Sequence, residues 1–438
     1  MTYEETLKKI DTYHRFSRKP GLACMTELLS RLGDPQRGLH VVHVAGTNGK
    51  GTTCTLVASV LTAAGYCTGL YLSPHVCDFR ERIQLCGEMI PREQLVSAAA
   101  HVFAEADRML AEGKQITEFE MITAAAMLWF SERHCDAAVM EVGMGGRFDA
   151  TNVVESPLVS AVASISLDHT EILGDTLGKI AGEKCGIFKP GCPAVCAPDE
   201  PPQALEVIRR AARERGCPLT EASLSSLKIV GSDLSGTVLE YGGRELRLPF
   251  LGEHQVKNAA LALAALEVLR GRGWKILPEA LRRGFAAARL PARLEVLSQE
   301  PPVLVDGAHN PGGTAALADA LRRYLPGKKI TAVMGMMADK DARGAAENLR
   351  GIFSRVIAVA PPSPRAMGAE SFAALWRAAG TEAQAAPGTE KALQLAFSGL
   401  GSGGALVVCG SLYLAGEARG PLLRILSGQC TEKKITQN

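Results

Sequence analysis

Apolar residues in the first two thirds of the chain occur in short runs that alternate with longer helical patterns. The run LHVVHVAG (39–46) is almost wholly apolar, which is typical of a strand buried on both faces. Helix-forming residues follow it directly over 49–65 and end at a glycine. Further strand-like runs lie at 67–73, 137–143, 158–166 and 193–198. This alternation predicts a mostly parallel sheet covered by helices on both faces.

The pattern changes farther along the chain. Residues 226–250 predict a small antiparallel addition, and a long amphipathic helix over 254–270 follows it. Near 287–302 the periodicity stops and prolines appear, which is typical of a linker. The strand and helix alternation then restarts, with strand-like runs at 302–308, 330–336, 355–361 and 405–411.

These patterns predict an α/β protein of two domains. We expect a P-loop-type domain with a mostly parallel sheet over 1–290, a linker over 291–301, and a smaller Rossmann-like α/β domain over 302–438. The length of 438 residues also favours two domains, because one hydrophobic core seldom serves so long a chain.

Composition and charge narrow the class of protein. The net charge is +2 without a basic cluster, which argues against a nucleic-acid or anionic-membrane partner. The start of the chain lacks the apolar core of a signal peptide, and no apolar span is long enough to cross a membrane. The 12 cysteines include no CxxC pair, so we expect reduced thiols and no zinc site. A monomer in the cytoplasm is the resulting expectation.

The stretch HVAGTNGKGTT (43–53) has the composition of a phosphate-binding loop. A strand that leads through glycines into a helix presents backbone N–H groups to an anion, and Lys50 can neutralise a terminal phosphate. The spacing departs from the general phosphate-loop pattern, because Gly51 separates Lys50 from Thr52. The alternative interpretation is a glycine-rich turn with a surface lysine.

Polar side chains at other strand ends could hold a metal ion. Ser73 follows the second strand, Glu141 ends an apolar strand before a glycine-rich loop, and His169 follows a further strand. Oxygen ligands at this edge of a sheet suit Mg²⁺ beside a nucleotide phosphate. The alternatives are a strand-ending turn, a helix-capping glutamate and a structural histidine.

Lys184 lies on an apolar helix, in the sequence GEKCGIF. Burial in such surroundings should lower the pKa of its amine, and a neutral amine can react with CO₂. The alternative is an ion pair with Glu183 or Glu171. In the second domain, Asp306 and His309 follow a strand and precede a helix, and the segment GMMADKD (335–341) repeats this arrangement after the next strand.

Seven segments together resemble the folylpolyglutamate synthases and dihydrofolate synthases, which are relatives of the Mur ligases. The segments are HVAGTNGKGT, SPH, EVGMGGRFDATN, LDHTEILGDTLGKIAGEKCGIFKPG, DGAHNPGG, DKD and GSLYLAGEAR. Their order matches the family, and the resemblance extends from about residue 5 to 425. It implies an ATP-dependent ligase that activates a pterin-linked carboxylate as an acyl phosphate and joins it to L-glutamate.

The resemblance also implies roles for individual residues. It assigns Lys50, Lys184 and His309 to catalysis, and Ser73, Glu141 and His169 to magnesium. A carbamate on Lys184 would hold a second Mg²⁺. The expected ATP contacts are Thr47, Asn48, Gly49, Lys50, Gly51, Thr52, Asn258, Arg293 and Asp306.

A ligase that accepts dihydropteroate as well as reduced folates needs contacts to the pterin. We expect Phe148, Asp149 and Ala150 to form one wall of that site, and Thr117, Glu118, Phe119 and Glu120 the other. Aromatic rings stack on a pterin and a carboxylate can accept from its N–H groups. Asp149 could instead cap the turn before Thr151. The alternative functions are a monofunctional folylpolyglutamate synthase, a Mur-type peptide ligase, and a nucleotide-binding protein without catalysis.

Overall fold

The computed structural model describes residues 1–13, 21–401 and 403–435. The chain divides into two compact units. The first contains Met1–Lys228, Glu240–Arg247 and Val256–Ala288, and the second contains Ile229–Leu239, Leu248–Gln255 and Arg289–Asn438. The domain boundaries expected from the sequence, at 290 and 302, remain predictions.

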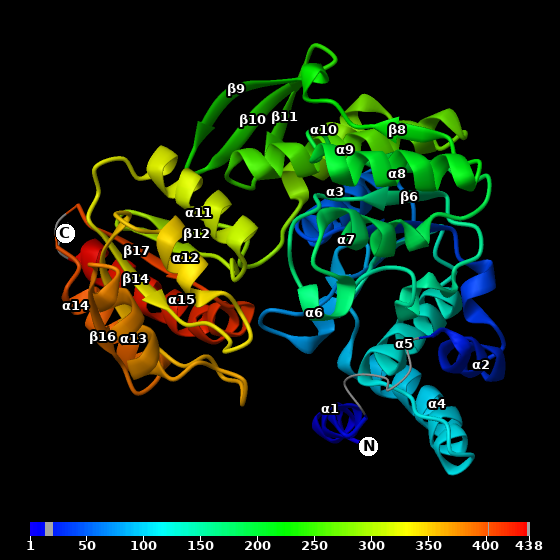
Figure 1. The fold of residues 1–438 in the computed structure, drawn as a ribbon, viewed down its shortest axis with the longest axis horizontal. Helices are drawn as coiled ribbons and strands as arrows, with labels where there is room; N and C mark the ends of the chain where they lie inside the picture. Colours follow the sequence, from blue (N-terminus) through cyan, green and yellow to red (C-terminus); the bar gives the residue numbers. More distant parts are fainter. Residues whose placement is uncertain (14–20, 402, 436–438) are drawn as a thin grey trace. The chain divides into compact units, whose positions relative to one another are not determined.

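An eight-stranded sheet forms the centre of the first unit (Figure 1). Its order is β4-β3-β2-β5-β1-β6-β7-β8, and every neighbouring pair from β2 to β8 is parallel. The strands are β1 (Val41–Ala45), β2 (Thr68–Tyr71), β3 (Ile83–Leu85), β4 (Glu88–Met89), β5 (Ala137–Glu141), β6 (Val159–Val162), β7 (Ala194–Cys196) and β8 (Leu219–Glu221). The predicted mostly parallel sheet is therefore confirmed.

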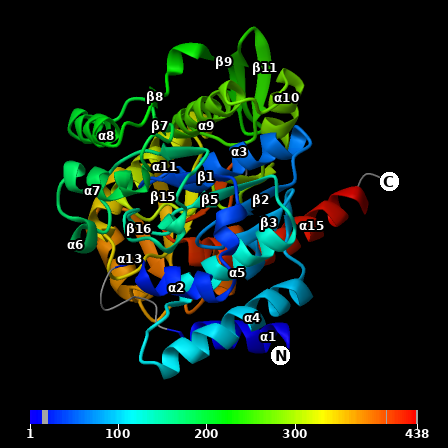
Figure 2. The same ribbon diagram turned by 90° about the vertical axis from the view of Figure 1, so that its right-hand side faces the viewer.

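Helices cover this sheet. They are α1 (Tyr3–Asp11), α2 (Ala23–Arg31), α3 (Lys50–Ala63), α4 (Arg92–Ala111), α5 (Glu118–Glu132), α6 (Thr170–Leu173), α7 (Leu177–Lys184), α8 (Pro202–Glu214), α9 (Glu253–Gly271) and α10 (Pro278–Ala287). Helix α3 packs against β2, β5 and β1 on one side and α10 on the other, so its residues are apolar or small on nearly all faces. Figure 2 shows α1 alongside α4, which itself packs on α5.

A three-stranded sheet in the order β11-β10-β9 comprises β9 (Leu227–Asp233), β10 (Gly236–Tyr241) and β11 (Arg244–Leu248). Two residues join each successive pair, and so short a connection permits only antiparallel neighbours. This agrees with the antiparallel addition predicted over 226–250.

A six-stranded sheet in the order β12-β13-β17-β14-β15-β16 forms the core of the second unit. Its strands are β12 (Glu295–Gln299), β13 (Pro302–Val305), β14 (Ile330–Met334), β15 (Phe353–Ala358), β16 (Glu382–Ala385) and β17 (Ala405–Cys409). The helices are α11 (Pro311–Tyr324), α12 (Ala342–Asn348), α13 (Ala369–Ala378), α14 (Thr389–Ser398) and α15 (Leu412–Ile435). Only β12 is antiparallel to its neighbour, so the second α/β fold is also confirmed.

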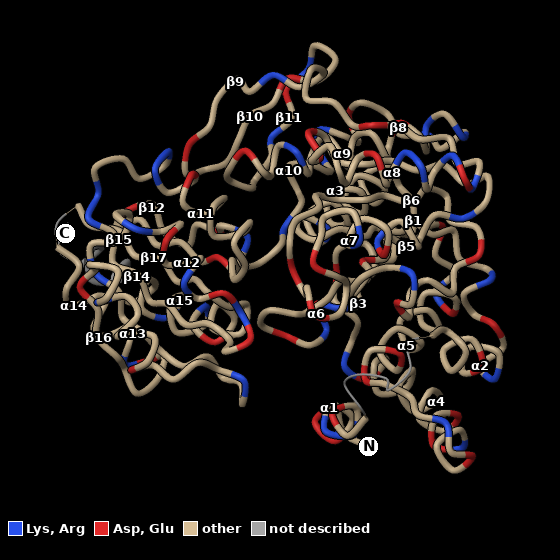
Figure 3. Tube along the Cα trace, viewed as in Figure 1, with Lys and Arg blue, Asp and Glu red and all other residues tan. Residues whose placement is uncertain are grey.

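Acidic and basic residues are interspersed along both units (Figure 3). No helix in the described parts of the chain has the length and apolar character needed to cross a membrane. Cysteines with described side chains are free thiols.

Candidate active site

Residues 46–49 form the turn between β1 and α3. Gly49 caps the amino terminus of α3 with a φ of 86°, which lies in the left-handed region that glycine adopts without strain. The first N–H groups of a helix lack partners within the helix, so they can bind an anion. Gly51 and Thr52 are buried in the first turn of α3. The local fold therefore has the form of a phosphate-binding loop.

The segment that follows β6 forms hydrogen bonds with this turn. The backbone N–H of Thr47 donates to the carbonyl oxygen of Ser164 (2.8 Å), and that of Asn48 donates to the same oxygen (3.4 Å). The Thr47 hydroxyl donates to the carbonyl oxygen of Ser166 (3.1 Å). The sequence analysis missed both serines, although two small polar residues spaced by one after a buried strand could have indicated them.

Two lysines converge on this turn. Lys184 Nζ donates to the carbonyl oxygen of Gly46 (2.7 Å), and Lys50 Nζ donates to the same oxygen (3.1 Å) and to that of Thr47 (3.2 Å). Burial, and then the charge of Lys50, lower the pKa of Lys184 to about 7. Its amine is therefore partly neutral near physiological pH. The structure thus brings together two of the predicted catalytic residues.

The glycine-rich loop after β5 lies against the end of α7. A Cβ at Gly146 would lie 2.8 Å from the carbonyl oxygen of Lys184, so only glycine fits there. The backbone N–H of Arg147 donates to the carbonyl oxygen of Glu183 (2.9 Å), and the two side chains form an ion pair (3.3 Å). Glu183 thus pairs with Arg147, which leaves the alternative ion pair of Glu183 with Lys184 without support.

Two of the predicted magnesium ligands lie together. The backbone N–H of Ser73 donates to Glu141 Oε2 (2.9 Å), and Glu141 is buried. The Ser73 hydroxyl is also buried and has no hydrogen-bond partner among the described residues. An orphaned hydroxyl beside a buried carboxylate is a pair of hard oxygen donors, which fits Mg²⁺.

His169 immediately precedes the short helix α6, has a φ of 50° and is exposed. Within the described part of the chain, no group of three or more His, Cys, Asp or Glu side chains is arranged to hold a metal ion. The predicted magnesium ligands include only two residues of these types, Glu141 and His169, because the third ligand is Ser73.

Asn258 on α9 lies directly over the turn. Its side-chain Oδ1 occupies the space that a Cβ on Gly49 would need. Together with the left-handed φ, this contact explains why the chain has glycine at that position. Asn258, which the family resemblance linked to ATP, is therefore adjacent to the phosphate loop within the first unit.

The segment 117–120 forms the start of α5. Thr117 and Glu120 form a capping box, in which the Thr117 hydroxyl accepts from the Glu120 backbone N–H (3.2 Å) and Glu120 Oε2 accepts from the Thr117 backbone N–H (2.8 Å). Their polar groups thus stabilise the helix end. Glu118 is half-buried in the first turn. The Phe119 ring packs on the loop after β5, because a Cβ on Gly143 would lie 2.6 Å from it.

The opposite predicted wall, at 148–150, has one exposed and two buried residues. Phe148 is 52% exposed, whereas Asp149 and Ala150 are buried. Asp149 accepts from the backbone N–H of Met144 (3.0 Å) and from the hydroxyl of Thr151 (2.6 Å). The turn-capping role considered for Asp149 is thus observed, while its contact to a pterin stays a prediction. Helix α5 packs against the turn Ala150–Val153, which follows Asp149.

In the second unit, three further predicted residues surround the end of β13. Asp306 is buried, and its carboxylate accepts from the backbone N–H groups of Leu294 (2.7 Å) and Ala308 (2.7 Å). Burial raises the pKa of Asp306, and the nearby charge of Arg293 opposes that rise. His309 Nδ1 lies 2.8 Å from the carbonyl oxygen of Gly307.

The sequence analysis missed His254, which lies near Arg293. Burial, and then the charge of Arg293, lower the pKa of His254 to about 4. A single histidine at the start of an amphipathic helix gave no signal of this position.

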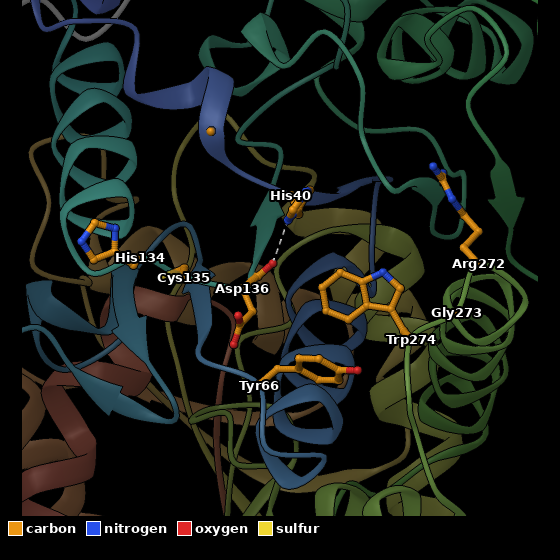
Figure 4. A pocket seen from close by; sticks show the side chains of 9 residues that line it. His40, Tyr66, His134, Cys135, Asp136, Arg272, Gly273 and Trp274 are labelled. Carbon is orange, nitrogen blue, oxygen red and sulfur yellow. Dashed lines mark hydrogen bonds between the residues drawn. The ribbon is translucent and has the colours of Figure 1, made fainter.

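A separate hollow of about 500 Å³ lies at the amino-terminal ends of β1, β2 and β5 (Figure 4). Tyr66 and Trp274 pack against each other there, with ring centroids 4.7 Å apart, and His40 lies beside Trp274. None of the predicted site residues lines it. Ligands in open α/β sheets bind at the carboxyl ends of the strands, which is where the phosphate loop lies.

Comparison with known proteins gives two family matches. Residues 44–266 match the Mur ligase middle domain, and residues 292–412 match the Mur ligase glutamate ligase domain. The chain is 37% identical over 432 residues to the folylpolyglutamate synthase of Lacticaseibacillus casei, covering 97% of this chain and 99% of that protein. It is 35% identical over 428 residues to the dihydrofolate synthase/folylpolyglutamate synthase of Bacillus subtilis, covering 95% and 98%.

Solved structures agree with these matches. The Mycobacterium tuberculosis folylpolyglutamate synthase complexed with ADP and AMPPCP has a TM-score of 0.87 at 32% identity, over 95% of this chain and 97% of that one. Escherichia coli FolC in complex with DHPP and ADP has a TM-score of 0.85 at 29% identity, over 98% of each chain.

Proposed function

The chain belongs to the folylpolyglutamate synthase and dihydrofolate synthase family of Mur ligases, and we propose from this premise that it adds L-glutamate both to dihydropteroate and to reduced folates. The chain is an ATP-dependent ligase of folate metabolism, as its full-length relatives are. The use of dihydropteroate is the proposed part. The observation that carries it is the full-length similarity to the Bacillus subtilis protein, whose name states both activities.

The reaction requires the carboxylate of the pterin substrate to be activated. ATP transfers its γ-phosphoryl group to that carboxylate and leaves as ADP. The amine of L-glutamate then attacks the acyl carbon, and the tetrahedral intermediate collapses with loss of phosphate. Negative charge develops on phosphoryl and carbonyl oxygens, so fixed positive charge in a dry site contributes most of the rate.

The phosphate loop supplies part of that charge. Backbone N–H groups at residues 49–52 bind phosphate oxygens, and Lys50 neutralises the terminal phosphate. Following the family resemblance, we also assign Asn258, Arg293 and Asp306 to the nucleotide and His309 to catalysis. The convergence of Lys50 and Lys184 on Gly46 supports the assignment of these two lysines to the phosphate site.

We assign Ser73, Glu141 and His169 to one Mg²⁺. A carbamate on Lys184, whose amine is buried and has a lowered pKa, would supply carboxylate oxygens for a second. Bound there, the two ions supply positive charge beside the transferred phosphoryl group. Burial of Glu141 and the unpartnered hydroxyl of Ser73 support the first assignment.

The pterin would bind between the exposed ring of Phe148 and the start of α5, near Phe119. We expect the enzyme to act as a monomer in the cytoplasm, without nucleic acid or membrane as partners. A monofunctional folylpolyglutamate synthase is the second candidate, because the Lacticaseibacillus casei relative carries only that name.

A phosphate-release assay tests the proposal. Purified protein receives MgATP and either dihydropteroate, tetrahydrofolate or a peptidoglycan precursor, each with and without L-glutamate. We expect release that depends on glutamate with the first two substrates. Release with tetrahydrofolate alone would establish the monofunctional candidate, and release with the peptidoglycan precursor alone would identify a Mur-type ligase.

A further inference from the structure

Glu200 is a buried acid that none of the roles above includes. It lies in the loop between β7 and α8, and its side chain is only 7% exposed. Strands β6 and β7 are parallel neighbours, with Val162 opposite Cys196, so the loops that follow them leave the same edge of the sheet. That edge is where the phosphate loop lies.

Among the described residues, one backbone N–H group donates to the carboxylate of Glu200. The N–H of Ile165 donates to both carboxylate oxygens, at 3.1 Å and 3.3 Å. Ile165 is itself buried, so without Glu200 its N–H would lose its partner away from water. The acid therefore fixes the orientation of the peptide between Ser164 and Ile165.

The two residues beside Ile165 are those that hold the phosphate loop. The carbonyl oxygen of Ser164 accepts from the backbone N–H groups of Thr47 and Asn48. Ser166 interacts with Thr47 twice, since its backbone N–H donates to the Thr47 hydroxyl (3.1 Å) and its carbonyl oxygen accepts from it (3.1 Å). One hydrogen bond thus separates Glu200 from the segment that anchors the loop.

The charges around Glu200 also connect it with the loop. Burial raises the pKa of Glu200 to about 8, while the Ile165 N–H and the charge of Lys257 oppose that rise. Lys257 forms an ion pair with Asp199 (3.2 Å). The next residue along α9 is Asn258, whose side chain covers Gly49. A buried acid costs stability, so its presence here calls for a function in positioning.

We propose that Glu200 is a positioning residue for nucleotide binding, which orients the 164–166 segment through the Ile165 N–H and so sets the geometry of the phosphate loop. This inference rests on the proposed function, since it takes the loop to bind the phosphates of ATP or ADP. Glu200 does not contact the nucleotide.

Calorimetric titration of the full chain with Mg-ADP tests this role in four variants. Glu200→Ala removes the acceptor, Glu200→Gln keeps an oxygen acceptor on a side chain of the same length, and Glu200→Asp keeps the carboxyl group but shortens the side chain. Glu206→Ala is the matched control, because Glu206 is exposed and lines the same small hollow as Glu200. Thermal melting of each variant reports on folding.

We expect the Kd for Mg-ADP to rise about tenfold in Glu200→Ala and Glu200→Asp, the typical effect of one lost hydrogen bond. Glu200→Gln should bind within about threefold of wild type, and Glu206→Ala should match it. Unchanged binding by folded Glu200→Ala or Glu200→Asp would overturn this inference and leave the proposed function standing. Equal weakening in Glu200→Gln and Glu200→Ala would also overturn the inference, because an oxygen acceptor at this position would then fail to restore binding. Absence of Mg-ADP binding by the wild type would overturn the proposed function as well.

Discussion

Lys50 and Lys184 donate hydrogen bonds to one acceptor, the carbonyl oxygen of Gly46. Lys50 is the first residue of α3, and Lys184 is the last residue of α7. Lys184 lies 138 positions after Gly46 in the chain. Like charges this close disfavour a second ammonium, which together with burial lowers the pKa of Lys184. The predictions below follow from this pair and its surroundings.

Replacement of Lys50 by alanine should abolish turnover and leave the fold intact. The side chain of Lys50 is half-buried and contacts backbone oxygens, so it contributes charge more than packing. Loss of such a group from a phosphoryl-transfer site lowers kcat by roughly 100-fold or more. The measurement is glutamate-dependent phosphate release, with circular dichroism as the fold check and Lys8→Ala, an exposed lysine on α1, as the control. A folded Lys50→Ala enzyme with near-normal activity would contradict the nucleotide assignment.

Lys184 should carry a carbamate in the active enzyme. A partly neutral amine reacts with CO₂, and the product carboxylate would be stabilised by Lys50 and magnesium. Carbon-13 NMR of protein in labelled bicarbonate should show one carbamate signal. Lys184→Ala should lose the signal, and Lys179→Ala, an exposed lysine on the same helix, should keep it. A fully active enzyme without the signal would refute the modification.

The unmodified Lys184 amine should make stability depend on pH. Its pKa is about 7 in the folded chain, against an ordinary value of 10.5. Between these values the unfolded chain binds a proton that the folded chain does not, so folding is penalised at low pH and the penalty falls as pH rises. In CO₂-depleted buffer, the free energy of unfolding of wild type relative to Lys184→Met should rise by up to about 1.4 kcal/mol per pH unit between about pH 7 and pH 10. Denaturant titrations at several pH values measure it. A flat difference would show that the pKa is not lowered.

The exposed ring of Phe148 should contribute to pterin binding and not to folding. Phe148→Ala should leave the free energy of unfolding within about 0.5 kcal/mol, because the side chain is 52% exposed. Loss of a stacking surface should raise the KM for dihydropteroate by about threefold to tenfold. Ile172→Ala, at another exposed apolar residue, is the control. An unchanged KM would remove Phe148 from the pterin site.

Asp149 distinguishes a pterin contact from a cap. Its carboxylate accepts from Met144 and Thr151, so Asp149→Ala should disturb the turn whichever role it has. If Asp149 also contacts the pterin, ligation to dihydropteroate should fall more than ligation to tetrahydrofolate. Equal loss of both activities would make Asp149 a structural residue only.

The sequence predicted most of the fold because its strands are apolar runs with few interruptions. β1, β5 and β14 are wholly buried, so their patterns were clear. β12 lies within the stretch that we expected to be a linker. The sequence shows no clear strand pattern there, because the side chains of β12 are mostly half-buried and prolines surround it. Its pairing with β13 is a tertiary contact that no local pattern reports.

The candidate site was predictable only in part. The glycines and Lys50 follow a strand in the sequence and Glu141 ends one, and the carboxyl ends of parallel strands share one edge of the sheet. The shared acceptor of Lys50 and Lys184 could not be predicted, since it depends on how α7 packs against the loop. The sequence analysis did not identify the capping box of Thr117 and Glu120, although a Thr-x-x-Glu pattern before an apolar run signals one. Their contact to a pterin stays a prediction.

Mass spectrometry of the product tests the dual ligase activity most directly. Purified enzyme is incubated with MgATP, L-glutamate and bicarbonate, with dihydropteroate in one reaction and tetrahydrofolate in another, and Lys50→Ala serves as the inactive control. We predict a product one glutamyl residue heavier than the substrate in both reactions, with ADP formed in equal amount. Absence of that product from dihydropteroate, while tetrahydrofolate is extended, would contradict the dual activity, and its absence from both would contradict folate ligation altogether.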